Sequence, residues 1–225
     1  MPEFFTTKFF KRTSVIFLVF AIIGLITLAI FVHYHKVLGL DVFLSRDLQA
    51  EGDTAIRKVQ IFDFLYAVSF IGKTFVAAAM VFLVAAGFWL LKYYRETIFT
   101  FLTLLAAAIN SGIKLIVNRP RPADGLVTVI NREMDASFPS GHVVFYTVFF
   151  GFLIAAMFFT PKIPKWLRII ICIISAGLII SVSFSRVYLG AHWATDVIAG
   201  YLEGFILLFI LLYFYLSRMR KNSSQ

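Results

Sequence analysis

The chain has 225 residues, 60% of them hydrophobic, and a mean hydropathy of +0.89. This composition is too apolar for an ordinary soluble domain of that length and indicates an integral membrane protein. The net charge of +9 would also fit nucleic acid binding, but the basic residues stand in small clusters beside apolar segments. That arrangement favours a role in membrane orientation, and we expect no nucleic acid partner.

Apolar stretches with polar boundaries divide the chain into predicted membrane spans. There are six of them, over residues 14–32, 74–91, 97–117, 141–160, 168–184 and 193–216. Residues 37–72, between the first two spans, mix charged residues with apolar ones at helical spacing. This pattern predicts amphipathic helices on the membrane surface, one around Leu40 to Leu48 and another over residues 54–70.

The predicted fold is therefore an all-α integral membrane protein. It has six transmembrane helices, amphipathic interfacial helices between spans 1 and 2, and a single domain over residues 1–225. Basic clusters lie in both terminal tails and at residues 92–95 and 161–168, and such clusters mark cytoplasmic ends. Both termini are thus predicted to be cytoplasmic, which agrees with an even number of spans.

A basic stretch ends the third span. Lys114 is followed by Arg121, which two flanking prolines, Pro120 and Pro122, hold in an extended segment where a helix cannot continue. Lys114 and Arg121 could then converge on one anion, although a basic cluster at a membrane boundary is also typical of simple headgroup contact. The polar loop that follows, up to Ser137, is expected to cover a site or shape access to it.

The fourth span opens with Pro139-Ser140-Gly141-His142. Ser140 is a good N-cap, Gly141 lets a ligand approach the backbone, and free N–H groups at a helix start attract phosphate. His142 could donate a proton to a leaving oxygen there. The alternative is an ordinary capped helix with an interfacial histidine.

The segment Ser185 to Asp196 (SRVYLGAHWATD) interrupts the last apolar run. If a helix runs through Trp193, Asp196 lies on the same face as His192, four residues before it, and can fix its tautomer. Arg186 offers a planar fork for two phosphate oxygens. An isolated His-x3-Asp pattern is, however, more often part of a structural ion pair, here between Asp196 and Arg186.

These three motifs together resemble the signature of the type 2 phosphatidic acid phosphatase superfamily. Their order and internal spacing match it from Lys114 to Asp196, and the flanking spans fit its six-helix membrane fold. Within the superfamily, the chain is most similar to the bacterial phosphatidylglycerophosphatase B and undecaprenyl-diphosphatase type. Small size and this resemblance imply a bacterial plasma membrane, with the active site on the extracytoplasmic face.

The resemblance also implies a role for each motif residue. His192 is the nucleophile that forms a phosphohistidine, Asp196 orients it, and His142 protonates the leaving group. The phosphate oxygens are held by Lys114, Arg121, Ser140, Gly141 and Arg186. No metal and no cofactor is required, which agrees with the lack of a carboxylate cluster for two metals in the sequence.

The function expected from the sequence is hydrolysis of a membrane lipid phosphate or diphosphate within the bilayer. Undecaprenyl diphosphate, phosphatidylglycerol phosphate and phosphatidic acid are the candidate substrates. Two alternatives are a phosphatase for a soluble phosphate ester and a non-catalytic lipid-binding or transport protein. Glu203, two helical turns after Asp196, is expected to be structural.

Overall fold

A computed structural model describes residues 8–50 and 55–222, with side chains for residues 15–50 and 59–217. All regular secondary structure in these residues is α-helical. The helices are α1 (Lys8–Tyr34), α2 (Gly39–Ala50), α3 (Ala55–Ile71), α4 (Thr74–Leu90), α5 (Tyr94–Leu102), α6 (Leu105–Val117), α7 (Gly141–Met157), α8 (Lys165–Tyr188) and α9 (Ala194–Asn222). Thr54, predicted to lie in the second interfacial helix, is outside the described residues.

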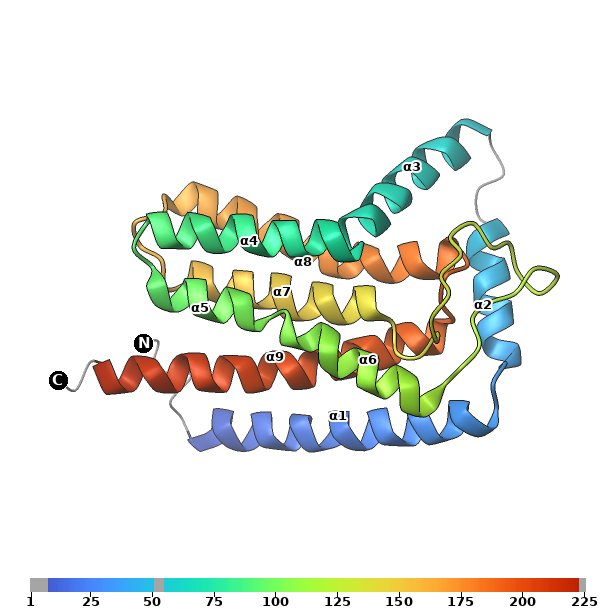
Figure 1. The fold of residues 1–225 in the computed structure, drawn as a ribbon, viewed down its shortest axis with the longest axis horizontal. Coiled ribbons are helices and arrows are strands. Elements are labelled where there is room, and N and C mark those ends of the chain that lie inside the picture. The colour runs from blue at the N-terminus through green and yellow to red at the C-terminus, as the bar shows by residue number, and fades with distance from the viewer. Residues whose placement is uncertain (1–7, 51–54, 223–225) are drawn as a thin grey trace.

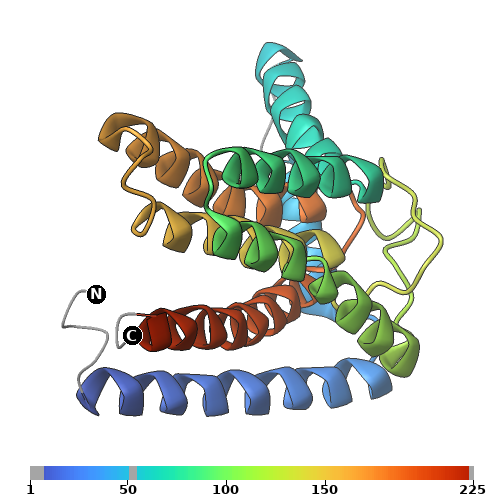
Figure 2. The same ribbon diagram turned by 60° about the vertical axis from the view of Figure 1, so that its left-hand side comes forward.

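Seven helices, α1 and α4 to α9, run roughly along one direction (Figure 1). Helix α2 stands across one end of this bundle, next to the long loop between α6 and α7. Helix α1 begins and α9 ends at the opposite end. Helix α3 leaves the bundle at an angle, as Figure 2 shows most clearly. The end that carries α2 is called the loop end below.

Helix α7 forms the centre and packs most extensively against α8 and α9. Its sequence is apolar on all sides, so most of its residues can be buried. Two glycines of α9 allow the close approach. A Cβ atom at Gly200 would lie 2.9 Å from Cβ of Val143, and one at Gly204 would lie 2.7 Å from Cβ of Thr147. Small residues of this kind bring membrane helices together, and here they fix the start of α7 beside α9.

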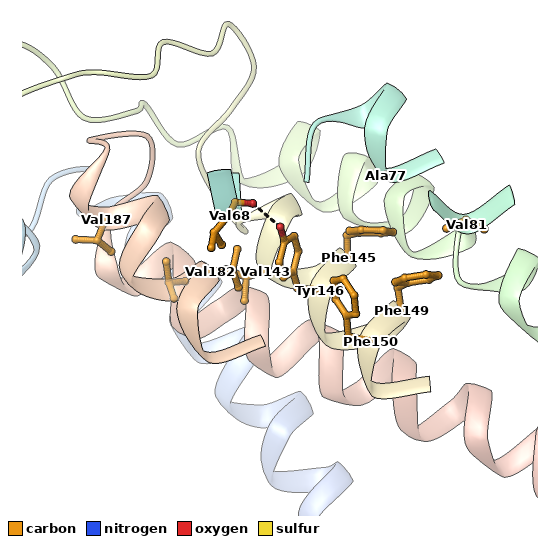
Figure 3. Close-up of a cluster of buried hydrophobic side chains, with 11 residues drawn as sticks. Val68, Ala77, Val81, Val143, Phe145, Tyr146, Phe149, Phe150, Val182 and Val187 are labelled. Atoms are coloured by element: carbon orange, nitrogen blue, oxygen red, sulfur yellow. Dashed lines mark hydrogen bonds between the residues drawn. The ribbon is translucent and has the colours of Figure 1, made fainter. Parts of the chain in front are cut away.

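A second part of the core joins α3 and α4 to α7 (Figure 3). The hydroxyl of Tyr146 donates a hydrogen bond to the carbonyl of Val68 in α3. Around it, Phe145 and Phe149 stack with their ring centroids 5.3 Å apart. The Tyr146 hydrogen bond holds the end of α3 against the second turn of α7.

Four helical stretches are long and apolar enough to cross a membrane: Val15–Tyr34, Tyr94–Val117, Lys165–Tyr188 and Ala194–Ser217. A fifth is obtained if Val59–Ile71 and Thr74–Leu90, bent by 67°, form one broken span. The predicted fourth span is α7, which has 17 residues and is about 26 Å long, shorter than a hydrocarbon core of about 30 Å. The chain is thus an all-helical, multi-pass membrane protein with four to five candidate spans, and six spans remain a prediction.

The predicted helix around Leu40 to Leu48 is present as α2, but its two faces are used differently from the expectation. Leu40 and Phe43 point outward, with 61% and 63% of their surface exposed, as on a membrane surface. Two of its polar residues, Asp41 and Ser45, are buried and therefore not solvated. Helix α2 packs against α8 and α9.

Candidate active site

All the predicted site residues lie at the loop end of the bundle (Figure 1), where α6 and α8 end and α7 and α9 begin. Helix α6 stops at Asn118, whose φ of 44° is left-handed, and the proline-containing segment after it leads back over the helix ends. The structure therefore brings the three sequence motifs to one place. Their chemical roles are argued below as proposals.

Three cations meet around two carboxylates of the loop. Lys114 Nζ lies 2.6 Å from Asp135 Oδ2, and Arg121 Nη2 lies 2.5 Å from Asp135 Oδ1. Arg121 Nη2 is also 2.8 Å from Glu133 Oε2, while Arg186 forms an ion pair with Glu133 Oε1. Lys114, Arg121 and Arg186 are called the cation cluster below. Asp135 bridges the first two of these cations, and Glu133 bridges the last two. Several cations that converge on anionic oxygens are also what recognition of a phosphate group requires.

His192 lies against this cluster and is buried, with 1% of its surface exposed. Its Nε2 atom is 3.1 Å from Arg121 Nη1. Because arginine can only donate, Nε2 carries the lone pair and the proton is on Nδ1. Nδ1 in turn is 3.5 Å from Ser137 Oγ and 3.6 Å from Asp196 Oδ2. This tautomer is the one that a nucleophilic Nε2 requires.

The sequence had indicated that His192 and Asp196 lie on one face of a helix, but the structure pairs them in another way. Helix α9 begins at Ala194, so His192 lies in the preceding turn. The Asp196 carboxylate accepts the backbone N–H of Trp193 at 2.9 Å, in the manner of a capping box, and also accepts the Ser137 hydroxyl. Asp196 therefore caps its own helix while it faces the imidazole.

His142 lies on the α3 side of the site. Its Nε2 is 3.2 Å from the carbonyl oxygen of Ser69, which can only accept, so Nε2 is protonated and Nδ1 is the nitrogen left for a transferred proton. The Ser69 hydroxyl accepts a hydrogen bond from Arg186 Nη1 at 2.5 Å. Ser69 therefore connects His142 with the cation cluster.

Ser140 occupies the predicted N-cap position of α7, but its side chain makes no capping hydrogen bond. Its hydroxyl is buried without a partner, whereas its backbone N–H donates to the Asp196 carbonyl at 3.1 Å. At Gly141, a Cβ atom would lie 3.0 Å from Asn110 Oδ1, so the close neighbour of this glycine is a side chain of α6.

Ionisation of the groups outside the helices follows from these contacts. Burial alone would raise the pKa of Asp135, but hydrogen bonds and charge from Lys114 and Arg121 lower it to about 2. The pKa of Glu133 is also lowered, since the charges of Arg186 and Arg121 and the hydrogen bond from Arg186 outweigh its burial. Burial, followed by the charges of the cation cluster, lowers the pKa of His192 well below 6.5. Both carboxylates are therefore ionised and His192 is neutral at neutral pH.

The loop is fastened to the turn between α8 and α9. The N–H groups of Ile130 and Asn131 donate to the Leu189 carbonyl at 3.0 and 3.1 Å. Gly190 has a φ of +63°, and a Cβ atom there would lie 2.2 Å from the Thr128 carbonyl oxygen, so only glycine fits. Gln49 of α2 donates to this same oxygen at 2.8 Å. The carboxylates thus sit on an anchored segment.

Glu203 lies away from this arrangement. One of its carboxylate oxygens accepts a hydrogen bond from Asn110 Nδ2 at 2.8 Å, which links α9 to α6. This contact is in keeping with the structural role that the sequence indicated. Within the described residues, no group of three or more His, Cys, Asp or Glu side chains is placed to hold a metal ion.

Sequence reasoning missed several residues that contact the motif residues: Asp41, Ser69, Arg119 and Ser137. Arg119 lies two residues before Arg121 in the same basic stretch, and nothing in the sequence indicates that its side chain is buried. Asp41 and Ser69 come from segments interpreted as surface helices. In the structure Asp41 contacts Thr195 and Ser69 contacts His142, in each case across more than 70 positions. Nothing in the local sequence pattern of Asp41 or Ser69 indicates such a distant partner.

Comparison with known proteins gives the same assignment as the motifs. The model of the PAP2 superfamily matches residues 95–220, more than half of the chain. Phosphatidylglycerophosphatase B of Bacillus subtilis (strain 168) is 29% identical over 192 residues, which covers 81% of this chain and 87% of the relative. An undecaprenyl-diphosphatase of Sulfolobus acidocaldarius is 42% identical over 73 residues, covering 32% of this chain and 31% of that protein.

The fold also has a counterpart among solved structures. The crystal structure of a transmembrane PAP2 type phosphatidylglycerolphosphate phosphatase from Bacillus subtilis superposes with a TM-score of 0.69 and 24% identity. The match covers 88% of this chain and 94% of that one. The resemblance drawn from the three motifs is confirmed: this chain belongs to the PAP2 superfamily.

Proposed function

We propose that this protein is a lipid phosphate phosphatase that works through a phosphohistidine at His192. The observation that carries the proposal is the position of His192 Nε2, the lone-pair nitrogen, 3.1 Å from Arg121 within the cation cluster. A phosphate that replaced the loop carboxylates would bring its phosphorus close to that nitrogen. The three cations would then stabilise the charge on the oxygens that are not displaced.

The reaction proceeds in two displacements. In the first, the Nε2 lone pair of His192 forms a bond to phosphorus as the bond from phosphorus to the lipid oxygen breaks, and His142, which enters the step protonated on both ring nitrogens, gives its Nδ1 proton to that oxygen. In the second, water attacks phosphorus, the P–N bond breaks, and the water proton returns to His142. The products are the dephosphorylated lipid and inorganic phosphate, and the enzyme is restored. Asp196 stabilises the positive charge on the ring of His192 between the steps.

A lipid substrate is favoured by the multi-pass membrane fold and by the names of the relatives. These are a phosphatidylglycerophosphatase and an undecaprenyl-diphosphatase. We therefore propose phosphatidylglycerol phosphate, undecaprenyl diphosphate or phosphatidic acid as substrates. We also propose a single domain with six spans, with the loop end outside the bacterial plasma membrane and both termini in the cytoplasm. Every phosphate contact in this scheme comes from a side chain or the backbone, so the chemistry requires no metal.

The test is phosphate release by the purified protein from those three lipids and from a sugar phosphate. His192→Ala should lower turnover on every substrate by at least about a thousandfold. His35→Ala, a matched change of an exposed histidine, should leave turnover unchanged. Normal turnover by His192→Ala would remove the proposed nucleophile. Activity on the sugar phosphate alone would replace the lipid substrate by a soluble ester.

Excess EDTA should leave most of the activity intact. The substrate charge is handled here by Lys114, Arg121 and Arg186, whose charges do not depend on a bound ion. If EDTA abolished turnover and one divalent ion restored it, the reaction would instead depend on a metal.

A further inference from the structure

Behind His192, on the side away from the cation cluster, lies a buried chain of charged groups, of which the proposed mechanism uses only Asp196. Arg119 is 1% exposed, and Asp41 and Asp196 are each fully buried. Arg119 Nη1 is 2.6 Å from Asp196 Oδ1, and Arg119 Nη2 is 2.7 Å from Asp41 Oδ2. Its guanidinium therefore lies between one carboxylate from α9 and one from α2.

Other polar atoms complete this chain. Arg119 Nε donates to the Lys36 carbonyl at 2.9 Å, and Nη1 also donates to Thr195 Oγ1 at 2.7 Å. The backbone N–H and the hydroxyl of Thr195 donate to the two oxygens of Asp41 at 2.9 and 2.8 Å. All three guanidinium nitrogens of Arg119 are thus bonded. Fully satisfied buried networks of this kind hold their members in one geometry.

The effect on Asp196 is specific. Arg119 takes Oδ1, which leaves Oδ2 for Ser137, for the Trp193 N–H and for the approach to His192 Nδ1 at 3.6 Å. A carboxylate bound at both oxygens cannot rotate. Asp41, Arg119 and Asp196 together carry one net negative charge, on the opposite side of His192 from the cation cluster. That charge favours the positive ring that forms when Nε2 bonds to phosphorus.

We propose that Arg119 and Asp41 are positioning residues of the phosphatase site: Asp41 of α2 holds the Arg119 guanidinium, and Arg119 holds Asp196 in its orientation beside His192. The inference rests on the proposed function. It gives α2 a part in catalysis as well as in membrane contact. Arg119 touches no reacting atom and acts only through Asp196.

Asp41→Asn is the sharpest test, because the amide keeps the shape of the carboxylate but removes its charge. We expect kcat to fall by at least about tenfold, the scale seen when a partner that orients a catalytic group is lost. KM should stay within about twofold, since the phosphate contacts are untouched. The rate of 32P-phosphohistidine formation in a single turnover should fall with kcat. Asp47→Asn, the same change at an exposed position of α2, should alter none of these values.

Arg119→Lys is the second variant. It keeps the positive charge but has one nitrogen in place of a fork, so it cannot hold both carboxylates, and kcat should fall while KM is kept. Thermal unfolding and detergent gel filtration report whether each variant is folded. The inference would be overturned if folded Asp41→Asn had the kcat of wild type, or if only its KM were raised. It would also be overturned if neither variant gave folded protein. The last result would assign the chain of charges to stability only.

The two proposals fail differently. If wild-type protein releases no phosphate from any substrate, the proposed function itself is wrong. If wild type is active, His192→Ala is inactive and Asp41→Asn is fully active, only the positioning role is wrong.

Discussion

At the residue scale, the environment of His192 is asymmetric. Arg121 faces Nε2, and the acidic side chain of Asp196 faces Nδ1. The charge of Arg121 next to the Nε2 lone pair disfavours protonation of His192. It does not block attack in the proposed mechanism, because the phosphate would lie between Arg121 and His192. The site therefore keeps its nucleophile neutral and selects one tautomer by the same contacts.

This asymmetry predicts the acid side of the pH profile. A histidine must be neutral to attack, and the pKa of His192 is lowered well below 6.5 by burial and by the cations. The acid limb of kcat/KM, corrected for substrate ionisation, should thus lie below pH 6.5, since kcat/KM reports groups of the free enzyme. In Arg121→Gln one of these cations is gone, so the pKa should rise and the acid limb should move to higher pH. A limb that stays in place in this variant would contradict the role given to Arg121.

The sequence could predict the residue types of the site but not their full setting. Lys114, Arg121, Ser140, His142, Arg186 and His192 were recognised because each motif is local. Ser137 and Arg119 were not, because their roles depend on contacts with Asp196 across 59 and 77 positions. The unsatisfied hydroxyl of Ser140 is another case, since a serine before a helix normally caps it.

At the element scale, the loop between α6 and α7 does more than cover the site. Its carboxylates, Glu133 and Asp135, form ion pairs with the cation cluster and so compensate its three positive charges. In the proposed mechanism phosphate displaces these carboxylates, so we expect part of the phosphate binding free energy to be offset.

Neutralising one loop carboxylate should therefore tighten anion binding. In Asp135→Asn, the dissociation constant of inorganic phosphate should fall about tenfold, equivalent to about 1.4 kcal/mol, because the amide competes less well for Lys114 and Arg121. Titration calorimetry of the protein in detergent measures this directly. Asp124→Asn, which changes an exposed loop carboxylate paired with Arg132, is the matched control. Unchanged or weaker phosphate binding in Asp135→Asn would show that the loop carboxylate does not compete.

Helix α2 shows where periodicity succeeds and where it misleads. The spacing of Leu40 and Phe43 predicted a helix, and a helix is present. Periodicity places the polar face of such a helix in water, but here Asp41 is buried because it has a charged partner in Arg119. A pattern within α2 cannot reveal a partner that lies 78 residues away.

At the scale of the whole molecule, the bundle separates its two ends clearly. The site, α2 and the α6–α7 loop lie at one end, while α1 begins and α9 ends at the other (Figure 1). The sequence predicted this division from basic clusters and motif positions. It could not settle the number of spans, because α7 is short and the α3–α4 pair is bent by 67°.

The proposed orientation can be measured by cysteine labelling in intact cells, in a Cys172→Ser background. Met134→Cys, at a fully exposed position of the loop, should react with a membrane-impermeant maleimide added outside. Lys165→Cys, at the exposed start of α8 on the opposite end, should react only after the cells are opened. The reverse pattern would place the site in the cytoplasm.

Helix α2 connects the surroundings of the protein with the ion network next to His192. Leu40 and Phe43 rest on whatever adjoins the protein, and the same helix carries Asp41 on its inner side. The role proposed for Asp41 predicts that exchange of lipid for a short detergent, which changes what this helix rests on, alters turnover. We expect rates measured in micelles to differ from rates measured in vesicles.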